Sequence, residues 1–138
     1  MEVVILYGFI CSGKSTIAKE YETKGYTIFT FDIEKYFFGN LEKSIKNNKD
    51  VVIDAPIWNS NNLAFYTSFC AMCGIGLSEI KIHVLPHLEL NEVLLRVRNR
   101  WEADPSHINH QQFRDLNQCL EVIESRYRVE YQQIKFDS

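Results

Sequence analysis

The stretch Val3-Val4-Ile5-Leu6-Tyr7-Gly8-Phe9-Ile10-Cys11-Ser12-Gly13-Lys14-Ser15 decides the fold of this 138-residue chain. Its first five residues form an unbroken apolar run, which is typical of a strand buried on both faces of a sheet. The next eight residues match the pattern G-x-x-x-x-G-K-[ST] in full. A helix is predicted directly afterwards, over residues 13–24, with Gly25 as its C-terminal glycine. Strand, glycine-containing loop and helix in this order are the context in which the motif binds phosphate.

Outward from this loop, the sequence alternates strand and helix patterns. Apolar and β-branched runs predict strands at residues 3–7, 26–31, 51–54 and 79–85, with a last short strand expected at 132–137. Helical periodicity predicts helices at residues 13–24, 34–47, 60–73, 90–101 and 113–123. The pair Gly39-Asn40 is a potential break in the second helix. Alternating strands and helices are typical of a parallel sheet with helices on both faces, so residues 1–138 are expected to form one α/β domain.

Composition and charge exclude several classes of protein. Hydrophobic residues make up 46% of the chain and charged residues 24%, which is the mixture of an ordinary globular domain. The longest apolar runs are far shorter than a membrane span, so no membrane partner is expected. The net charge of −3 offers no basic field for nonspecific nucleic-acid binding. No basic leader precedes the first strand, and with four cysteines in such a context we expect a cytoplasmic protein with reduced thiols.

The loop Gly8–Ser15, called here the phosphate loop, predicts a site for ATP and Mg²⁺. Its two glycines permit unusual torsions and close approach, and its N–H groups together with the helix N-terminus form an anion nest. Lys14, expected to be solvated, would reach the outer phosphates, and the Ser15 hydroxyl would coordinate Mg²⁺. The Cys11 thiol, near a lysine and a helix N-terminus, is expected to have a lowered pKa. The residues expected to bind the nucleotide are Gly8, Cys11, Ser12, Gly13, Lys14, Ser15 and Thr16.

Two carboxylates follow predicted strands and are candidates for chemistry at the carboxyl edge of the sheet. Asp54 ends the run Val51-Val52-Ile53 and would hold Mg²⁺ through water; the alternative is an ordinary turn aspartate. Asp32 ends the second strand and would take the proton of an attacking hydroxyl; the alternative is an N-cap of the next helix. Glu34 is a second candidate for the base.

All six arginines fall within residues 96–128, and two of them are candidates for a lid over the transferring phosphate. Arg96 and Arg100 are four residues apart and share a helical face, within a lid region expected at about 96–110. Such positive charge stabilises a phosphoryl-transfer transition state. The alternative is a surface pair with Glu92, and salt bridges on helix surfaces are expected for most of the six.

The remaining signals favour structural roles. Cys70 and Cys73 have the spacing of metal ligands without a second pair, and core packing is favoured for them. Two histidines, His107 and His110, are interpreted as exposed. Aromatic residues that might otherwise stack on a base are interpreted as core, namely Phe37, Phe38 and Trp58.

These residues together resemble small P-loop kinases of the polynucleotide-kinase and zeta-toxin type, with shikimate and gluconate kinases as cousins. The resemblance rests on the phosphate loop, the Asp32-to-Lys35 step, the Val-Val-Ile-Asp-Ala segment, the strand at 82–85 and the Arg96-to-Arg100 step. It implies a P-loop NTPase three-layer α/β/α sandwich with a five-stranded parallel sheet in the order 2-3-1-4-5. It also implies that the first carboxylate acts as base or acceptor ligand and that lid arginines grip the nucleotide phosphates. Relatives often carry arginine where this chain has Lys35, and an arginine after the third strand, where this chain has none.

The sequence therefore predicts a kinase that transfers the γ-phosphoryl group of ATP to a hydroxyl. The acceptor is a small molecule, a nucleoside, a nucleotide or a polynucleotide 5′ end, with catalysis assigned to Lys14, Asp32, Arg96 and Arg100 and the metal to Ser15 and Asp54. A Ras-type GTPase is excluded, because no N-K-x-D sequence is present. A nucleoside monophosphate kinase should carry acceptor-site arginines, and none precedes Arg96. The other alternative is a nucleotide-binding regulatory module without turnover.

Overall fold

The computed structural model describes residues 1–31, 34–104 and 109–131, and these form two compact units. The first unit contains Met1–Gly8 and Gly13–Leu85. The second contains Phe9–Ser12 and the chain from Pro86 onward. The phosphate loop is therefore shared between the two units, since its central residues belong to the second and its ends belong to the first. Each unit is described by itself.

The first unit is built on a four-stranded parallel sheet in the order β2-β3-β1-β4. Its strands are β1 (Val3–Tyr7), β2 (Thr27–Thr30), β3 (Val51–Asp54) and β4 (Ile80–Val84). Val3 of β1 is in register with Val51 on one side and Ile80 on the other. A strand with neighbours on both sides and helices over both faces has no polar surface, which explains the apolar run at residues 3–6. The α/β class and the parallel sheet are thus confirmed.

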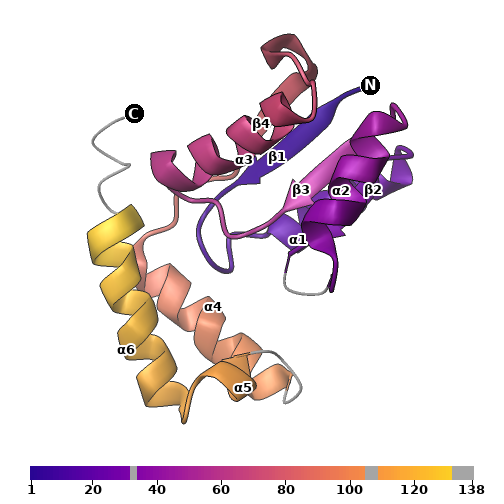
Figure 1. Cartoon of the computed structure of the whole chain (residues 1–138). Coiled ribbons are helices and arrows are strands. Elements are labelled where there is room, and N and C mark those ends of the chain that lie inside the picture. Colours follow the sequence, from indigo (N-terminus) through magenta and orange to yellow (C-terminus); the bar gives the residue numbers. More distant parts are fainter. Residues whose placement is uncertain (32–33, 105–108, 132–138) are drawn as a thin grey trace. The chain divides into compact units, whose positions relative to one another are not determined.

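Three helices cover the two faces of this sheet (Figure 1). Side chains alternate between faces along β1, so Val3 and Ile5 point to one side and Val4 and Leu6 to the other. The first pair packs with α2 (Phe37–Lys46) and α3 (Ser60–Met72). The second pair packs with α1 (Lys14–Thr23), through Ala18 and Tyr21. The first unit therefore has three layers, helix on sheet on helix.

The helices of the first unit end where the sequence predicts, but one begins later. Gly25 and Gly74 follow α1 and α3 with φ angles of 97° and 90°, a left-handed conformation that glycine adopts without strain. The predicted helix at residues 34–47 begins instead at Phe37, and before it the backbone N–H of Glu34 bonds to the Thr30 carbonyl. The pair Gly39-Asn40 lies inside α2 and does not break it.

The second unit packs helix against helix. Its described elements are α4 (Leu90–Ala103), α5 (Asn109–Gln112), α6 (Leu116–Arg126) and a π-helical turn, η2 (Tyr127–Tyr131). Phe9 of the phosphate loop is fully buried in this unit, with its ring 4.7 Å from the ring of Tyr131 and 5.6 Å from that of Tyr127. The Tyr127 hydroxyl donates to the Leu88 carbonyl at 2.7 Å. The centre of the phosphate loop is therefore anchored by an aromatic cluster.

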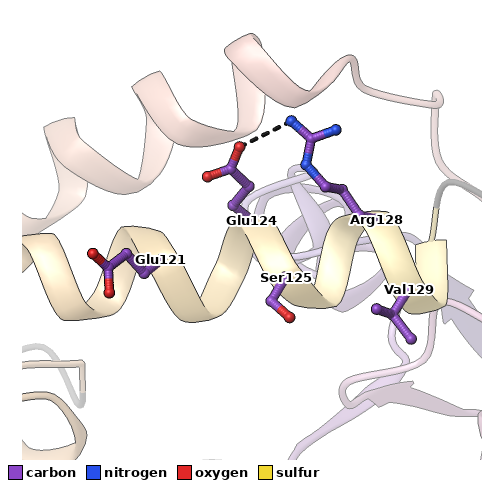
Figure 2. Close-up of a pocket in the computed structure, with 5 residues that line it drawn as sticks. All are labelled: Glu121, Glu124, Ser125, Arg128 and Val129. Carbon is purple, nitrogen blue, oxygen red and sulfur yellow. Dashed lines mark hydrogen bonds and ion pairs between the residues drawn. The ribbon is translucent and has the colours of Figure 1, made fainter.

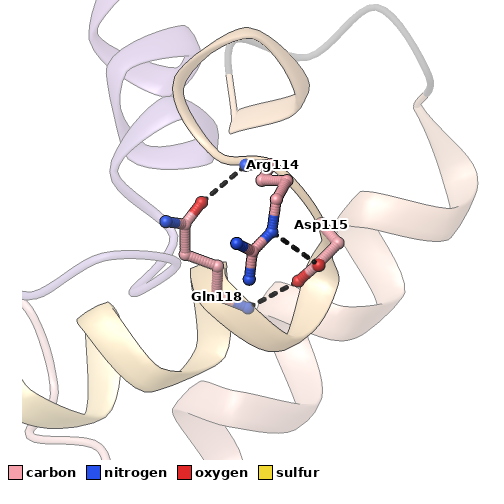
Figure 3. Close-up of polar contacts among 3 residues, drawn as sticks. All are labelled: Arg114, Asp115 and Gln118. Atoms are coloured by element: carbon pink, nitrogen blue, oxygen red, sulfur yellow. Dashed lines mark hydrogen bonds and ion pairs between the residues drawn. The ribbon is translucent and has the colours of Figure 1, made fainter.

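The start of α6 is set by an N-cap rather than by the first apolar residue of its pattern. Asp115 accepts a hydrogen bond from the backbone N–H of Gln118 at 2.8 Å. The Gln118 side chain accepts in turn from the backbone N–H of Arg114, and Arg114 pairs with Asp115 at 3.2 Å (Figure 3). This reciprocal capping begins the helix at Leu116, so the helix predicted from residue 113 starts three residues later.

Three expectations concern residues outside the described ranges. The short strand predicted at 132–137 lies outside them, as do Asp32 and His107. Within the described ranges, no helix is both long and apolar enough to cross a membrane.

Candidate functional site

The phosphate loop runs from the central strand β1 into α1, as its motif requires. Gly13 has a φ of 97° and is the N-cap residue of α1. A Cβ built on Gly13 would come no closer than 4.0 Å to Leu85 Cδ2, so the torsion, and not lack of space, calls for glycine. Gly8 is not in the left-handed region; its N–H donates to the Ile57 carbonyl at 2.9 Å and ties the loop to the segment after β3.

The N-terminus of α1 leaves donors that suit an anion. Among the described residues no side chain caps this helix, so its first N–H groups have no side-chain acceptor there. Ser15 and Thr16 lie exposed in the first turn. Ser12 is buried, and its Oγ has no hydrogen-bond partner among the described residues. Uncapped N–H groups at a helix N-terminus match the oxygens of a phosphate group.

Lys14 is held more firmly than the sequence suggested. Its Nζ donates to the Ala55 carbonyl at 2.9 Å and lies 5.8 Å from the centre of the Trp58 ring. The side chain is half-buried, so the expectation of a solvated lysine is wrong. The physical reason is that the residues just after β3 fold back beside the start of α1 and offer a carbonyl and an aromatic face. The lysine of the loop is therefore fixed at the carboxyl end of β3.

Asp54 stands at this same end of β3. It is half-buried, in register with Thr30 of β2, and it precedes the residue that binds Lys14. The sheet thus brings Asp54 and Lys14 to one edge, although 40 residues separate them in sequence. Within the part of the chain that the structure describes, no three His, Cys, Asp or Glu side chains gather as a metal site. A magnesium ion held by Ser15, Asp54 and phosphate oxygens would not need such a group.

Arg96 makes the surface pair with Glu92 and a contact with the phosphate loop that the sequence analysis did not anticipate, while its role as a lid over phosphate stays a prediction. Its Nε donates to Glu92 Oε1 at 2.9 Å, the surface pair within α4. Its Nη1 donates to the Cys11 carbonyl at 2.9 Å, in the phosphate loop. Arg100, one turn later, is exposed, and its charge acts on the Cys11 thiol. Arg96 is therefore a direct support of the loop.

The expectation of an acidic Cys11 thiol is wrong. Burial raises the pKa of Cys11 above its ordinary value, and the charges of Arg100 and Arg96 only partly oppose this shift. The residue also has a φ of 60°, an uncommon conformation for a side chain with a Cβ. Its contact with Arg96 through the carbonyl compensates part of that strain. Cys11 thus serves the loop through its backbone.

Of the two candidate bases, only Glu34 falls among the described residues. Asp32 lies outside them, so its role as base or helix cap stays a prediction. Glu34 follows β2 in a turn closed by its N–H bond of 3.1 Å to the Thr30 carbonyl. Its Oε2 is buried without a hydrogen-bond partner in the described part of the chain. Such an atom costs about 1–3 kcal/mol until it meets a donor.

Two other arginines make ion pairs on helix surfaces. Arg114 pairs with Asp115, and Arg128 pairs with Glu124 at 3.0 Å, as expected for helix surfaces. The second pair lies in an open pocket on α6 and η2 (Figure 2), lined by Glu121, Glu124, Ser125, Arg128 and Val129. None of these residues was predicted to belong to the functional site. The expectation that His110 is exposed is wrong, because it is half-buried, with its Nε2 2.8 Å from the Trp101 carbonyl and its ring against that of Trp101.

The predicted core positions are mostly confirmed. Cys70 is fully buried and Cys73 is half-buried at the end of α3, and neither belongs to a metal site within the described residues. Phe37 and Trp58 are buried. Phe38 is only half-buried, and it lies among exposed aromatic residues that the sequence analysis did not single out.

No protein-family model matches the chain, and no curated protein is significantly similar to it. The class of the protein therefore rests on its own features. It is an α/β protein whose central parallel strand leads through G-x-x-x-x-G-K-S into an uncapped helix.

Proposed function

We propose that this protein is an ATP- and Mg²⁺-dependent kinase of the P-loop NTPase class. The observation that carries the proposal is the placement of the complete motif. Gly13 adopts the left-handed torsion, α1 is left uncapped, and Lys14 is held at the strand end that bears Asp54. Chance matches to the motif would not bring these three features together.

The donor site is assigned to the phosphate loop and the end of β3. The N–H groups of the loop and of the α1 N-terminus would receive the phosphate oxygens. Lys14 would exchange its bond to the Ala55 carbonyl for the outer phosphates, a stronger charge-assisted contact. Ser15 and Asp54 would hold the magnesium ion, which neutralises charge on the transferred group. Cys11 and Ser12 of the loop, and Thr16 in the first turn of α1, would contribute backbone N–H and hydroxyl groups to the same site.

The reaction is transfer to a hydroxyl group. The acceptor oxygen forms a bond to the γ-phosphorus while the bond from phosphorus to the bridging oxygen breaks and ADP leaves. The hydroxyl proton passes to a carboxylate and then to water, and we assign this carboxylate to Asp32. Arg96 supports the loop through the Cys11 carbonyl, and Arg100 adds positive charge for the transition state.

The finer architecture is part of the same proposal. A fifth strand formed by residues 132–137 would complete a sheet in the order 2-3-1-4-5. This arrangement is the one implied by the resemblance to kinases of the polynucleotide-kinase and zeta-toxin type. The acceptor would accordingly be a small alcohol, a nucleoside, a nucleotide or a polynucleotide 5′ end.

One observation favours a second candidate, a nucleotide-binding regulatory module. Two cations that a kinase would use are engaged in internal contacts, Lys14 with the Ala55 carbonyl and Arg96 with Glu92 and Cys11. A module that only senses nucleotide would keep such contacts. A nucleoside monophosphate kinase lacks comparable support, because no arginine precedes Arg96 in the sequence.

A screen with γ-labelled ATP and Mg²⁺ distinguishes these candidates. The acceptors are nucleosides, nucleotides, oligonucleotides with 5′-hydroxyl ends and small alcohols, each tested with wild-type protein and with Lys14→Ala. The kinase proposal expects label transfer to one acceptor class that the variant abolishes. ATP binding without transfer to any acceptor would establish the module instead, and absence of ATP binding would overturn both.

A further inference from the structure

An exposed group of aromatic rings lies at the carboxyl end of the sheet in the first unit. Phe31, Phe38 and Phe65, called here the aromatic patch, come from the end of β2, from α2 and from α3. The Phe38 ring centre is 6.3 Å from that of Phe31 and 5.8 Å from that of Phe65, both with edge-to-face geometry. Phe31 is 41% exposed and Phe65 is 57% exposed. Large rings held in contact yet left open to solvent mark a surface that binds something.

The aromatic patch is rigidly supported from below. Phe38 stacks on Tyr66 at 6.0 Å and meets the edge of Phe69 at 5.2 Å. Tyr66 is buried in the core between α3 and the sheet. Fixed rings lose little conformational entropy when a flat ligand covers them, which makes them effective binding surfaces.

Hydrogen bonds place this patch next to the lysine of the phosphate loop. The backbone N–H of Phe31 donates to the Asp54 carbonyl at 3.0 Å. Lys14 Nζ donates to the carbonyl of the next residue, Ala55, at 2.9 Å. The aromatic patch and the phosphate-binding lysine are thus fixed to consecutive residues at the end of β3. A ligand on the patch would lie beside a phosphoryl group held by Lys14.

A second observation points to a ligand at this edge. Glu34 lies in the turn that contains Phe31, closed by the bond from its own N–H to the Thr30 carbonyl. Its Oε2 is buried and has no hydrogen-bond partner among the described residues. A buried carboxylate oxygen needs a donor, and a bound hydroxyl or amino group supplies one. Apolar rings and an unpaired acceptor three residues from Phe31 in the sequence suit a flat ring that carries polar hydrogens.

We propose that the aromatic patch binds the heteroaromatic ring of the phosphoryl acceptor and that Glu34 accepts a hydrogen bond from the same molecule. This inference rests on the proposed kinase function and narrows its acceptor to the nucleoside class, either free or at an oligonucleotide end. Ring stacking on phenylalanine recognises the flat face that every base has, and the carboxylate adds orientation. An alcohol without a ring could not stack on the aromatic patch.

The experiment measures binding and transfer separately. Calorimetric titrations with ATP, adenosine, thymidine, a 5′-hydroxyl oligonucleotide and glycerol are made on wild type, Phe31→Ala, Phe65→Ala and Glu34→Gln. Met72→Ala is the matched control, because Met72 is an apolar residue of α3 that is 86% exposed and outside the patch. Alanine is the best helix former, so Phe65→Ala and Met72→Ala should both fold. The KM of each acceptor is then measured for the same proteins by transfer of label from ATP.

The inference expects that nucleosides or the oligonucleotide bind and that each phenylalanine variant weakens this binding about five- to 100-fold, the range of base–aromatic stacking. Glu34→Gln should weaken it about tenfold. ATP affinity and the Met72→Ala control should stay at the wild-type value. Preference for the free nucleoside over the oligonucleotide, or the reverse, identifies the source of the ring.

Two results would overturn the inference and leave the kinase standing: glycerol accepted as well as nucleosides, or nucleoside affinity unchanged in both phenylalanine variants while ATP still binds. Failure of the proposed kinase function is seen separately, as absence of label transfer from ATP to any acceptor, whether or not the wild-type protein binds ATP. In that case too, the nucleoside titrations show whether the aromatic patch binds the ring, since they need no phosphoryl transfer.

Discussion

Replacing Gly13 with alanine tests the phosphate loop, and the chain supplies a matched control. Gly13 and Gly25 both have a φ of 97°, so both are in the left-handed region. A Cβ at Gly13 would meet only Leu85 Cδ2 at 4.0 Å, and a Cβ at Gly25 would meet nothing within 4 Å. Neither substitution creates a clash, and each costs only the torsional energy of an L-residue in this region, about 1–2 kcal/mol. Gly13→Ala and Gly25→Ala should therefore lower the free energy of unfolding equally.

Their effects on nucleotide binding should differ. Gly13 lies where the phosphates would approach the backbone of α1, whereas Gly25 follows the far end of the same helix. A methyl group at Gly13 excludes that approach, so we expect Gly13→Ala to lose ATP affinity by about 100-fold or more, a loss of about 3 kcal/mol. Gly25→Ala should bind ATP like the wild type. Thermal melts should show equal decreases for both variants, about 3–8 °C.

The assay is a calorimetric ATP titration in Mg²⁺ beside urea unfolding curves of the three proteins. Stability serves as the internal control, because a folding defect alone would affect both variants alike. Equal ATP affinity in Gly13→Ala and Gly25→Ala would refute the proposal that the phosphate loop binds ATP, whatever the stability data show. A much larger loss of stability in Gly13→Ala would show that the loop is strained beyond its torsion.

Four further outcomes are expected. Lys14→Ala should abolish phosphoryl transfer and lower the free energy of unfolding by about 1 kcal/mol, through the lost bond to the Ala55 carbonyl; transfer at the normal rate would exclude its role. Asp32→Asn should reduce transfer about 100-fold with unchanged melting temperature, and equal rates would leave it a helix cap. Arg96→Gln should lower kcat more than it raises the ATP KM; a change in thermal stability alone would make it a surface pair. Because burial raises the pKa of Cys11, its alkylation by iodoacetamide should be slow at pH 7 and accelerate only above the ordinary thiol pKa, and rapid labelling at pH 7 would contradict the buried loop.

Local patterns were enough to predict most elements of the fold. The apolar run at β1, the Gly-Lys-Ser step into α1 and the glycines after α1 and α3 all stand where the sequence placed them. These features depend on torsions and on burial of a whole strand, which neighbouring residues determine. The start of α2 was not predictable, because its N-cap, Tyr36, makes no side-chain cap hydrogen bond and is not a residue type that marks a helix start.

The contacts of the candidate site could not be predicted, because they join residues far apart in the chain. Lys14 binds a carbonyl 41 residues away, and Arg96 binds one 85 residues away. Every residue has a backbone carbonyl, so no sequence pattern identifies the Ala55 and Cys11 carbonyls as the partners of Lys14 and Arg96. The sequence contained a weak signal for the aromatic patch at Phe38, but the ring that Phe38 contacts, Phe65, lies on another helix.

By itself, then, the amino-acid sequence determined the strand–loop–helix unit, the parallel α/β class and the residue types at the phosphate loop, since all three follow from local torsions and periodic burial. Only the tertiary structure decided which atoms these residues meet. It half-buries Lys14 at the end of β3 and sets the exposed rings of Phe31 and Phe65 beside Phe38. It also raises the pKa of Cys11 where the helix N-terminus alone would lower it. Burial and partner choice are set by the packing of distant segments, and desolvation outweighs the local electrostatic effect at that thiol.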